Sequence, residues 1–516
     1  MDLDRSGFFL KQGYKSKSES PYYVAEQQQD VVHQPLVYDF AAYLAERYGC
    51  SRIIDLGCGR ASKLAPIHPR MDVVGVDFGE NIEWCRRHYA FGEWVSHDFE
   101  RGPLQLVERA KVAGSVVVCA DVVEHLVNPT HLLATVRDLL EYAPVAVLTT
   151  PERDLVRGRN DMGPPANPWH VREWNMSEFR LLLEDAGIEV LFHGLTFNNN
   201  VQWQKRTIVT VVRRPGPALV VPPEFRVVAL VGVYNEEDVI VPFLEYTISQ
   251  GIEVHLLDNG STDRTAERAA RFLHRGLRAI EKFPESGPSP THDWAGMLNR
   301  KAELASRTEG DWFIHLDADE IRESPWPGLT LREALCRVDR EGFNAVDHAC
   351  VVFHPTGGNF LEDRAIQPQF PYFEFGTRPA HFMQIKAWKR QPGPVECAES
   401  AGHAVSFPGR RVYPFKFLLR HYPIRSQQHG EKKVFVERLP RFRPVLRARG
   451  WHKQYDGISR NHAFVRDPST LSCFSPETFY DEYMIERLSG IGIARPGNAA
   501  APGSGYRINT GGVTAE

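Results

Sequence analysis

The stretch DWFIHLDADE, residues 311–320, joins an apolar run to a concentration of negative charge. The run leads directly into three carboxylates, Asp317, Asp319 and Glu320. A short apolar run bounded by polar residues is typical of a buried strand, and open α/β sheets bind ligands at the carboxyl ends of their strands. We therefore expect an α/β fold in which something positively charged meets these acids.

The bulk properties of the chain are those of a multidomain globular protein. At 516 residues it exceeds what one hydrophobic core usually organises. Its formal net charge of −4 argues against a general nucleic-acid-binding protein. Eight cysteines without a CxxC pair favour a reducing cytosol over a disulfide framework or a zinc cluster. The N-terminus lacks the regions of a signal peptide, and no apolar run approaches the roughly 18 residues of a spanning helix. We expect a cytoplasmic protein whose only membrane contact would be peripheral.

Two segments of the chain alternate strands with helices, which predicts two parallel-sheet α/β domains. We place the first at residues 1–214 and the second at residues 225–450. The segment PGPALVVPPE at residues 215–224 is typical of a proline-rich linker. Residues 451–516 form a C-terminal extension, whose tail from about residue 494 is expected to be disordered. The two domains share no motif, so the chain is a fusion and not a duplication.

The first domain contains a strand-turn-helix motif, SRIIDLGCGRASKL. Its strand ends in Asp55, and the turn Gly57-Cys58-Gly59 lets the backbone approach a ligand closely. A second strand, MDVVGVDF, ends in Asp77, where an acid can accept hydrogen bonds from a ribose diol.

Two further acids follow later candidate strands of the same domain, Asp98 in WVSHDFE and Asp121 in SVVVCADVVEHL. A ligand-free tight turn would explain the glycines alone but not this ordered set of acids. A dinucleotide site is disfavoured, because Ser62 stands where a third glycine would be expected.

Taken in order, these motifs resemble those of class I S-adenosylmethionine-dependent methyltransferases, with a Rossmann-like fold, over roughly residues 35–212. The resemblance implies S-adenosyl-L-methionine as cofactor and gives each motif a role. The methionine end would meet Asp55, Gly57, Cys58 and Gly59, the ribose Asp77, the adenine Asp98, and the transferred methyl group the segment from Asp121 to His125.

The acceptor side of this domain centres on NPWHVREW, which places His170 in a proline-flanked loop. A histidine there could take the proton from an acceptor hydroxyl during methyl transfer. It could equally be a loop histidine that hydrogen-bonds the backbone, and both interpretations stay open. Similar segments occur in methyltransferases of bacterial sugar and lipid pathways, which suggests an O-methyl acceptor.

The second domain has three polar motifs after candidate strands: VYNEED, LDNGSTDRT and HLDADE. An acid-x-acid pair such as Asp317 and Asp319 suits Mg²⁺ or Mn²⁺, which binds carboxylate oxygens and leaves positions for phosphate. Such a metal neutralises a diphosphate leaving group as its bond to a sugar breaks. Asp-x-Asp alone is common on protein surfaces, so the pair carries weight only within the set.

As a set, the motifs resemble family-2-like glycosyltransferases with the GT-A fold, which implies a nucleotide-sugar donor and a divalent metal. The nucleotide sugar would meet Tyr234, Asn235, Glu237, Asp258, Asn259, Asp317 and Arg425, and the metal Asp317, Asp319 and His421. The segments AESAGHAV and LLRHYPIRSQQHGEKK add His403, Lys432 and Lys433 as further phosphate or metal contacts.

The glycosyl-transfer base has no clear counterpart in the sequence. Asp363 in NFLEDRA has suitable chemistry, although that segment could be a surface loop, so inversion or retention of the sugar stays open. The stretch from Arg410 to Lys453 holds 13 Lys and Arg against two acids. It could bind donor phosphates, contact an anionic membrane, or be a solvated basic face.

The sequence thus predicts a bifunctional enzyme that acts on a glycan or glycolipid acceptor of a bacterial surface. Two alternatives remain: a methyltransferase whose second domain only binds carbohydrate or nucleotide, and an enzyme resembling a sugar-nucleotide pyrophosphorylase. The latter would want a glycine- and arginine-rich first loop, which VGVYNEED is not.

Overall fold

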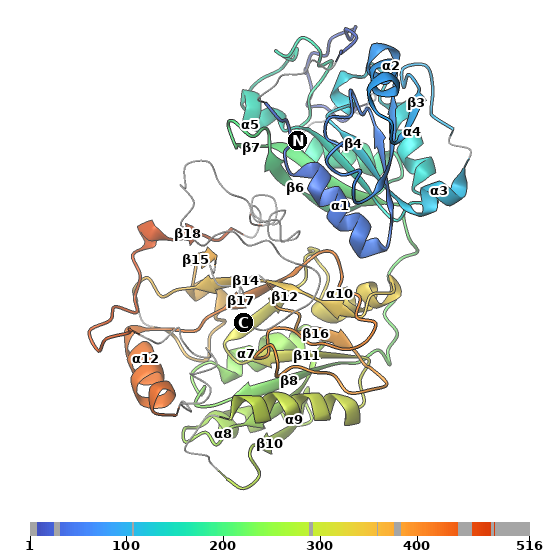
Figure 1. Cartoon of the computed structure of the whole chain (residues 1–516). Coiled ribbons are helices and arrows are strands. Elements are labelled where there is room, and N and C mark those ends of the chain that lie inside the picture. The colour runs from blue at the N-terminus through green and yellow to red at the C-terminus, as the bar shows by residue number, and fades with distance from the viewer. Residues whose placement is uncertain are drawn as a thin grey trace. The chain divides into compact units, whose positions relative to one another are not determined.

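The computed structural model describes residues 8–24, 31–105, 108–287, 293–358, 360–375, 383–441, 457–475 and 479. Contacts divide the chain into two compact units, one within Met1–Ala218 and one within Leu219–Ser475 (Figure 1). The tail from about residue 494, expected to be disordered, lies outside the described residues. Among the helices that are described, none is both long and apolar enough to cross a bilayer.

The first unit is a seven-stranded sheet in the order β3-β2-β1-β4-β5-β7-β6. Strands β1 to β5 are parallel, and β7 runs antiparallel to both β5 and β6. The strands are β1 (Arg52–Leu56), β2 (Asp72–Asp77), β3 (Glu93–Ser96), β4 (Ser115–Ala120), β5 (Ala146–Pro151), β6 (Glu189–Phe197) and β7 (Lys205–Arg213). The helices are α1 (Val37–Tyr48), α2 (Gly79–His88), α3 (Arg109–Ala113), η1 (Val123–His125), α4 (Thr130–Leu139), α5 (Arg153–Arg157) and α6 (Met176–Asp185).

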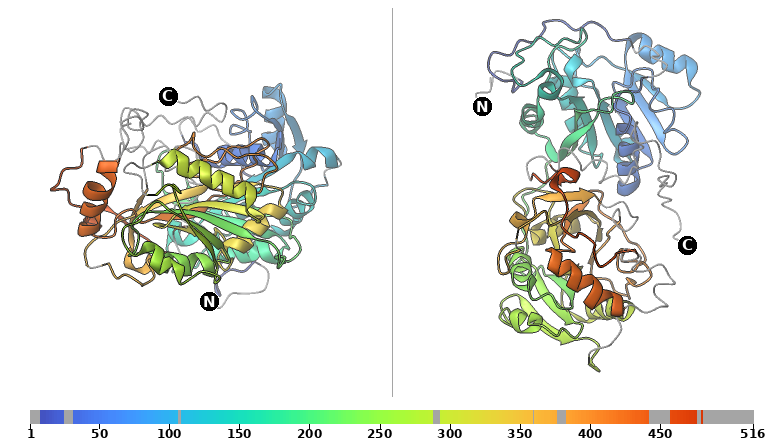
Figure 2. Two further views of the ribbon diagram at one scale, coloured as in Figure 1. Left: turned by 90° about the horizontal axis from the view of Figure 1, so that it is seen from below. Right: turned by 90° about the vertical axis from the view of Figure 1, so that its left-hand side faces the viewer.

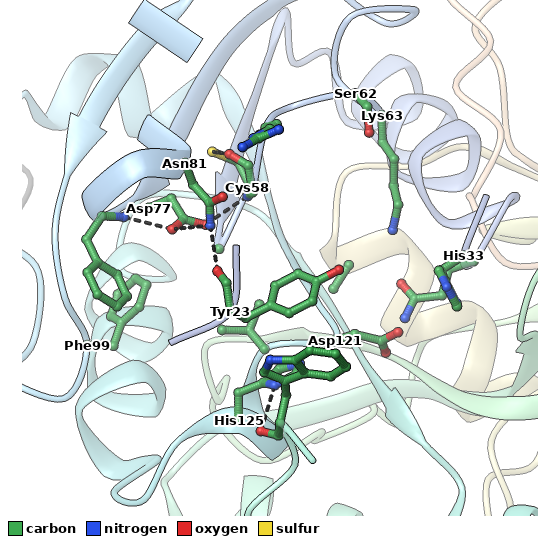
Figure 3. A pocket seen from close by; sticks show the side chains of 18 of the residues that line it. Tyr23, His33, Cys58, Ser62, Lys63, Asp77, Asn81, Phe99, Asp121 and His125 are labelled. Carbon is green, nitrogen blue, oxygen red and sulfur yellow. Dashed lines mark hydrogen bonds between the residues drawn. The ribbon is translucent and has the colours of Figure 1, made fainter. Parts of the chain in front are cut away.

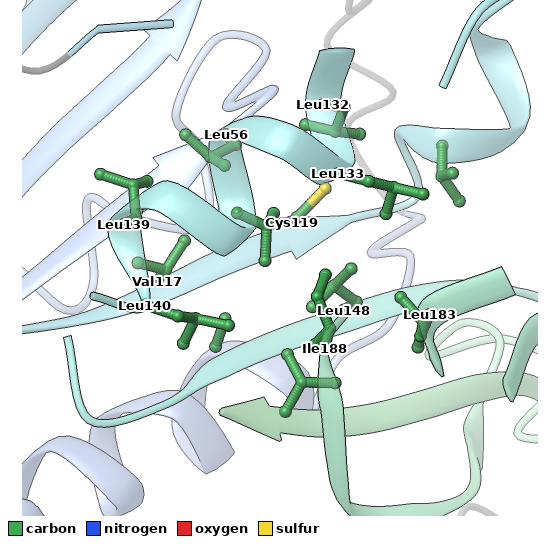
Figure 4. Packing of buried hydrophobic residues seen from close by; sticks show 14 of the residues in the cluster. Leu56, Val117, Cys119, Leu132, Leu133, Leu139, Leu140, Leu148, Leu183 and Ile188 are labelled. Atoms are coloured by element: carbon green, nitrogen blue, oxygen red, sulfur yellow. The ribbon is translucent and has the colours of Figure 1, made fainter. Parts of the chain in front are cut away.

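Apolar residues on the strands and helices of this unit form its core. Strand β4 is buried along its whole length, as expected for a central parallel strand with helices on both faces. Figure 4 shows side chains of α4 facing those of β4 and β5: Leu132, Leu133, Leu139, Val117, Cys119 and Leu148. This core holds the ends of β1, β2 and β4 at one edge of the sheet.

The second unit contains two sheets. The larger has the order β10-β9-β8-β11-β16-β13, in which β8 to β11 are parallel and β16 is antiparallel to both β11 and β13. Its strands are β8 (Val227–Val233), β9 (Glu253–Asp258), β10 (Leu277–Lys282), β11 (Trp312–Asp317), β13 (Ala345–Val346) and β16 (Ala387–Lys389). Helices α7 (Ile240–Ser249), α8 (Thr265–Ala270), α9 (Trp294–Arg307) and α10 (Leu331–Arg340) accompany it, and Figure 2 shows helices on both of its faces.

The smaller sheet has the order β12-β17-β14-β15-β18 and continues the chain beyond the acids of HLDADE. Its strands are β12 (Glu320–Glu323), β14 (His348–Phe353), β15 (Tyr372–Phe375), β17 (Phe417–His421) and β18 (Ser472–Cys473). The remaining elements are η2 (Gln367–Gln369), α12 (Gln427–Glu431), η3 (Lys432–Arg438), η4 (Leu439–Arg441) and η6 (Pro468–Thr470). Glu320 pairs with His421 across β12 and β17, so the acids stand where the two sheets meet.

Candidate functional site

A cavity of about 980 Å³ opens at the edge of the first unit where β1, β2 and β4 end. This volume is at the upper end of the range for ligand pockets. The residues that line it lie within segments 20–23, 31–39, 57–67, 77–89, 97–100, 120–127 and 167–170. Of the residues predicted individually for the first site, Asp55 lies directly beneath the turn. The others line the cavity: Gly57, Cys58, Gly59, Asp77, Asp98, Asp121 and His170.

The turn after β1 requires its glycines. Gly57 has a φ of +83°, and a Cβ there would lie 2.4 Å from Cγ2 of Val122. Gly59 also has a positive φ, and its backbone N–H donates to Oδ2 of Asp77 at 2.8 Å. The turn therefore brings the ends of β1 and β2 together. Any residue with a side chain at position 57 would have to displace Val122 to allow this turn.

Asp55 is almost fully buried beneath this turn, at 1% exposure. Its Oδ2 accepts a hydrogen bond from the Tyr38 hydroxyl at 2.8 Å, whereas Oδ1 has no partner in the part of the chain that the structure describes. Burial raises the pKa of Asp55 to about 7, although the Tyr38 hydrogen bond and the charge of Lys63 oppose the shift. A buried carboxylate oxygen without a donor is costly, so this atom is a candidate contact for a cationic ligand.

Asp77 and Asp98 lie farther along the same edge. Oδ1 of Asp77 accepts from the backbone N–H of Phe78 at 2.8 Å and from the Asn81 amide at 3.3 Å. Burial raises the pKa of Asp77, and these hydrogen bonds oppose the rise. Asp98 accepts from the Glu100 backbone and lies 3.2 Å from the Arg101 guanidinium. The structure therefore brings both predicted acids to the one cavity.

The far wall of the cavity contains Asp121 and His125. Asp121 has a φ of +53°, and burial raises its pKa against the opposing charges of Lys63 and His170. Burial lowers the pKa of His125 to about 4, so its imidazole is neutral near pH 7. Figure 3 shows Lys63 reaching into the cavity on the side where His33 and Asp121 lie.

His170 lies at the same wall with both ring nitrogens engaged. Nδ1 is 2.7 Å from Oε1 of Glu173, and Nε2 is 2.8 Å from the Asn167 amide nitrogen. Burial would raise the pKa of Glu173, but the contacts with His170 and Arg157 outweigh it and hold that pKa below its usual value. A carboxylate on Nδ1 fixes the tautomer in which Nε2 carries the lone pair, as a general base requires.

In the second unit, the predicted acids meet at the end of β8. Asp258 pairs with Val233 and Asp317 pairs with Gly232, so the acids flank β8 on its two sides. Between them the chain turns through Tyr234 and Asn235, and Asn235 has a φ of +55°. Because β9, β8 and β11 are parallel neighbours, residues far apart in sequence converge at one edge.

Several of these residues are already bonded within the chain. Asp258 accepts from Ser261, and the Asn235 amide donates to Oε1 of Glu437 at 3.0 Å. The Arg441 guanidinium donates to Asn259 at 2.9 Å and lies 3.7 Å from the centroid of the Tyr234 ring.

The three carboxylates of HLDADE each meet a cation from the chain itself. The nearest ammonium to Asp317 is that of Lys301, at 3.8 Å, and burial raises the pKa of Asp317. Burial would raise the pKa of Asp319, but Lys433, 2.8 Å from its Oδ2, outweighs this and holds that pKa well below its usual value.

Glu320 contacts Arg322 at 2.8 Å and Lys386 at 3.0 Å. Burial opposes its ionisation, but these two cations lower the pKa of Glu320 to about 2. The positive partner expected for the acids is therefore, in part, supplied by lysine and arginine side chains.

Arg425, predicted on the diphosphate, is fully buried beside these acids. It bonds Glu236 at 2.6 Å and Asp238 at 2.7 Å, and its Nη1 has no partner among the described residues. His421 lies 3.8 Å from Asp319. Lys432 pairs with Glu437 at 3.4 Å, and the ring of His403 contacts the Gln384 amide at 3.1 Å.

Glu237 and Asp363 lie at the outer side of this region. Oε2 of Glu237 accepts from Arg264 at 3.2 Å. The half-exposed Asp363 is 3.3 Å from the Arg268 guanidinium, which also donates to the Glu237 carbonyl. Within the described ranges, no hydrogen bond or ion pair joins Asp363 to Asp317 or Asp319.

Comparison with known families agrees with this geometry. Residues 26–192 match the family described as a methyltransferase domain, and residues 229–378 match glycosyl transferase family 2. The chain joins a methyltransferase domain to a family 2 glycosyltransferase domain. The predicted pairing of two families, and of two α/β folds, is confirmed.

Curated relatives match the methyltransferase domain. A probable S-adenosylmethionine-dependent methyltransferase of Mycolicibacterium smegmatis is 31% identical over 160 residues, which cover 29% of this chain and 59% of that protein. One from Mycobacterium tuberculosis strain H37Rv is 29% identical over 160 residues, covering 29% and 55%. The chain thus spans little more than half the length of these relatives.

A solved S-adenosylmethionine-dependent methyltransferase from Clostridium acetobutylicum is 12% identical, with a TM-score of 0.29. The match covers 37% of this chain and 94% of that one.

Some residues of the methyltransferase cavity were not predicted from the sequence. Tyr38 belongs to α1, before the glycine turn, and no pattern marks it as a partner of Asp55. The Tyr23 ring stacks on His125 and meets the Trp169 ring edge-on, although these residues come from segments far apart in sequence. Lys63 could have been predicted from the sequence, since it lies just after the glycine turn, where a basic residue can face a ligand.

The buried Asp55 gives the methyltransferase domain a specific pH dependence. Folding raises the pKa of Asp55 from 3.8 to about 7, so the folded state holds this proton more tightly than the unfolded state. The free energy of unfolding should therefore fall as the pH rises from about 4 to about 7. At most, this proton contributes about 1.4 kcal/mol per pH unit.

Urea unfolding of the wild type and of Asp55→Asn between pH 5 and 8 measures this contribution. We expect the slope against pH to be smaller in Asp55→Asn, because an amide does not titrate. Equal slopes in the two proteins would show that Asp55 is already ionised in the folded state.

Proposed function

We propose that this chain is a bifunctional transferase, with methyl transfer from S-adenosyl-L-methionine in its first domain and glycosyl transfer from a nucleotide sugar in its second. The observation that carries the first activity is Oδ1 of Asp55, which has no partner among the described residues and lies beside a cavity of about 980 Å³. The second activity rests on the two acidic strand ends that flank β8, at Asp258 and Asp317.

The cavity residues fit S-adenosyl-L-methionine. Asp55 would bind the methionine ammonium, and the positive-φ turn at Gly57 and Gly59 would let the methionine approach the backbone. Asp77 would accept from the ribose hydroxyls and Asp98 would lie near the adenine. When bound, the cofactor supplies a methyl group on a sulfonium, which a nucleophile attacks.

We assign the proton transfer to His170, which favours an oxygen acceptor. Glu173 holds Nδ1–H, so Nε2 carries the lone pair that accepts a hydroxyl proton. Nε2 now faces the Asn167 amide, whose place the acceptor hydroxyl would take. His125 is not assigned this step, because burial lowers its pKa to about 4.

Calorimetric titration with S-adenosyl-L-methionine tests the first site. We expect Asp77→Asn to weaken binding by roughly ten- to a hundredfold, since it removes a charged hydrogen-bond acceptor from the ribose. Asp72→Asn is the matched control, because Asp72 is the exposed first residue of the same strand. If the two variants bound S-adenosyl-L-methionine with equal affinity, Asp77 would not be a contact of the cofactor.

For the glycosyltransferase domain, we propose that Asp258 faces the nucleotide base and that Asp317 and Asp319 hold a divalent metal on the diphosphate. The acids fit a metal in one respect: Asp317 is still partly open to solvent, and its ion pair with Lys301 is long, at 3.8 Å. When bound, the metal supplies positive charge to the leaving diphosphate. Tyr234, Asn235, Glu237 and Asn259 would complete the nucleotide pocket, with Arg425 and His421 on the phosphate side.

Asp363 would be the base only if the reaction inverts the sugar. It is placed by Arg268 beside the loop that follows β8, which is the loop expected at the donor.

Titration with UDP and GDP in the presence of Mn²⁺ tests the second site. We expect one of them to bind the wild type and to lose at least about tenfold in affinity in Asp319→Asn, because a metal ligand is removed. Asp311→Asn, just before the amino end of β11, should bind like the wild type. Binding that is unchanged by Asp319→Asn would refute the metal assignment.

A second candidate function is that the glycosyltransferase domain only binds its ligand. The contacts of Glu437 and Arg441 with Asn235, Asn259 and Tyr234 favour it, because they cover residues expected at the nucleotide. A binding module would bind the nucleotide and release none from a mixture of UDP- and GDP-sugars, whereas an enzyme releases free UDP or GDP.

We further propose that the acceptor is a glycan or glycolipid of the bacterial surface and that the protein works in the cytoplasm, at the inner face of the membrane. One chain with both domains keeps a glycosylated intermediate near the methylating site. The basic stretch from Arg410 onward could contact anionic lipid, and its part from 442 to 453 lies outside the described residues.

A further inference from the structure

Segment 425–441, which comprises Arg425, α12, η3 and η4, lies over the motifs of the glycosyltransferase domain. At its start Arg425 bonds Glu236 and Asp238. Toward its end Glu437 accepts from Asn235, and Arg441 donates to Asn259. These bonds fix the segment at both ends and leave Lys433 between them.

Lys433 occupies the position of a cation at Asp319. Its Nζ lies 2.8 Å from Oδ2 of Asp319 and 3.6 Å from Oε1 of Glu236. The side chain is buried at 4% exposure, so solvent does not screen the contact. A divalent metal bound at this oxygen would lie within a few ångströms of the ammonium, and the two positive charges would repel each other.

The charges around this position are balanced without any ligand. Five carboxylates face five cationic side chains, joined by ion pairs between 2.6 and 3.8 Å. The acids are Glu236, Asp238, Asp317, Asp319 and Glu320, and the cations are Lys301, Arg322, Lys386, Arg425 and Lys433. A divalent metal that arrives alone would bring two uncompensated charges into a neutral cluster that is buried except at Asp238 and Asp317, which is costly.

A nucleotide diphosphate changes this balance. It brings at least two negative charges, which compensate the metal and offer phosphate oxygens to the displaced ammonium. We propose that Lys433 is a resident counter-cation that keeps divalent metal off Asp319 until the diphosphate arrives, and that it then moves to the phosphate. This inference rests on the proposed donor of the second domain.

The backbone that carries Lys433 is suited to such a movement. Residues Lys432–Arg438 form a π-helical turn directly after α12 (Figure 1). π-helical turns are rare and occur often at functional sites. Conversion of this turn to α-helix would rotate its residues relative to Asp319.

Titration of the full chain with Mn²⁺ tests the inference without any turnover. Binding is measured as the decrease in the electron paramagnetic resonance signal of free Mn²⁺. The wild type should bind Mn²⁺ alone weakly, and either UDP or GDP should raise its Mn²⁺ affinity at least about tenfold. Lys433→Met should bind Mn²⁺ alone at least about tenfold more tightly than the wild type, because Asp319 is left without its counter-cation. Adding Asp319→Asn to that variant should abolish the gain.

Two variants control for charge and folding. Lys416→Met removes another buried lysine from a 2.8 Å pair, with Asp347, and should bind Mn²⁺ like the wild type. Lys433→Arg keeps the positive charge and should also resemble the wild type. The inference would be overturned if the wild type bound Mn²⁺ as tightly without nucleotide as with it, whether or not the variants fold. It would also be overturned if Lys433→Met folded and its affinity for Mn²⁺ alone equalled that of the wild type. If neither nucleotide binds, the proposed donor fails instead, and the Mn²⁺-only comparison of wild type and Lys433→Met still decides the role of Lys433.

Discussion

A carboxylate buried at the end of a parallel strand must either find a positive partner or take up a proton. Both domains are organised around this constraint, and they meet it differently. In the methyltransferase domain, Asp55 has one hydrogen-bond donor and an elevated pKa, which leaves an acid ready for a cationic ligand. In the glycosyltransferase domain, Asp319 and Glu320 are neutralised by lysine and arginine side chains. A ligand that bound there would have to exchange partners with these side chains instead of filling an empty position.

The fold and the acidic ends of the strands could be predicted from sequence because both are local. An apolar run fixes the strand, and the residue that follows it must stand at the sheet edge. The cations could not be predicted in this way. Lys433 is 114 positions from Asp319, and Arg425 is 189 positions from Glu236. Such contacts depend on how a later segment folds back over the sheet, which no local pattern specifies.

The partners of Asp55 and His170 in the first domain could not be predicted from local sequence patterns either. The glycine turn and Asp77 follow a known spacing, whereas Tyr38 reaches Asp55 from a helix that precedes the sheet. The loop predicts His170 as a candidate base, but its tautomer depends on Glu173, three residues later, where sequence spacing alone does not reveal a hydrogen bond. Chemistry at both sites is therefore set by second partners that only the folded chain brings into place.

Hydrogen exchange of the full chain, with and without ligands, tests most directly that one chain holds two separate ligand sites at its strand ends. S-adenosylhomocysteine should slow exchange in peptides around residues 53–60 and 77–81 and leave residues 231–237 and 256–260 unchanged. UDP or GDP with Mn²⁺ should produce the opposite pattern. The account of two working sites would be contradicted if S-adenosylhomocysteine protected the methyltransferase peptides and neither UDP nor GDP protected the glycosyltransferase peptides.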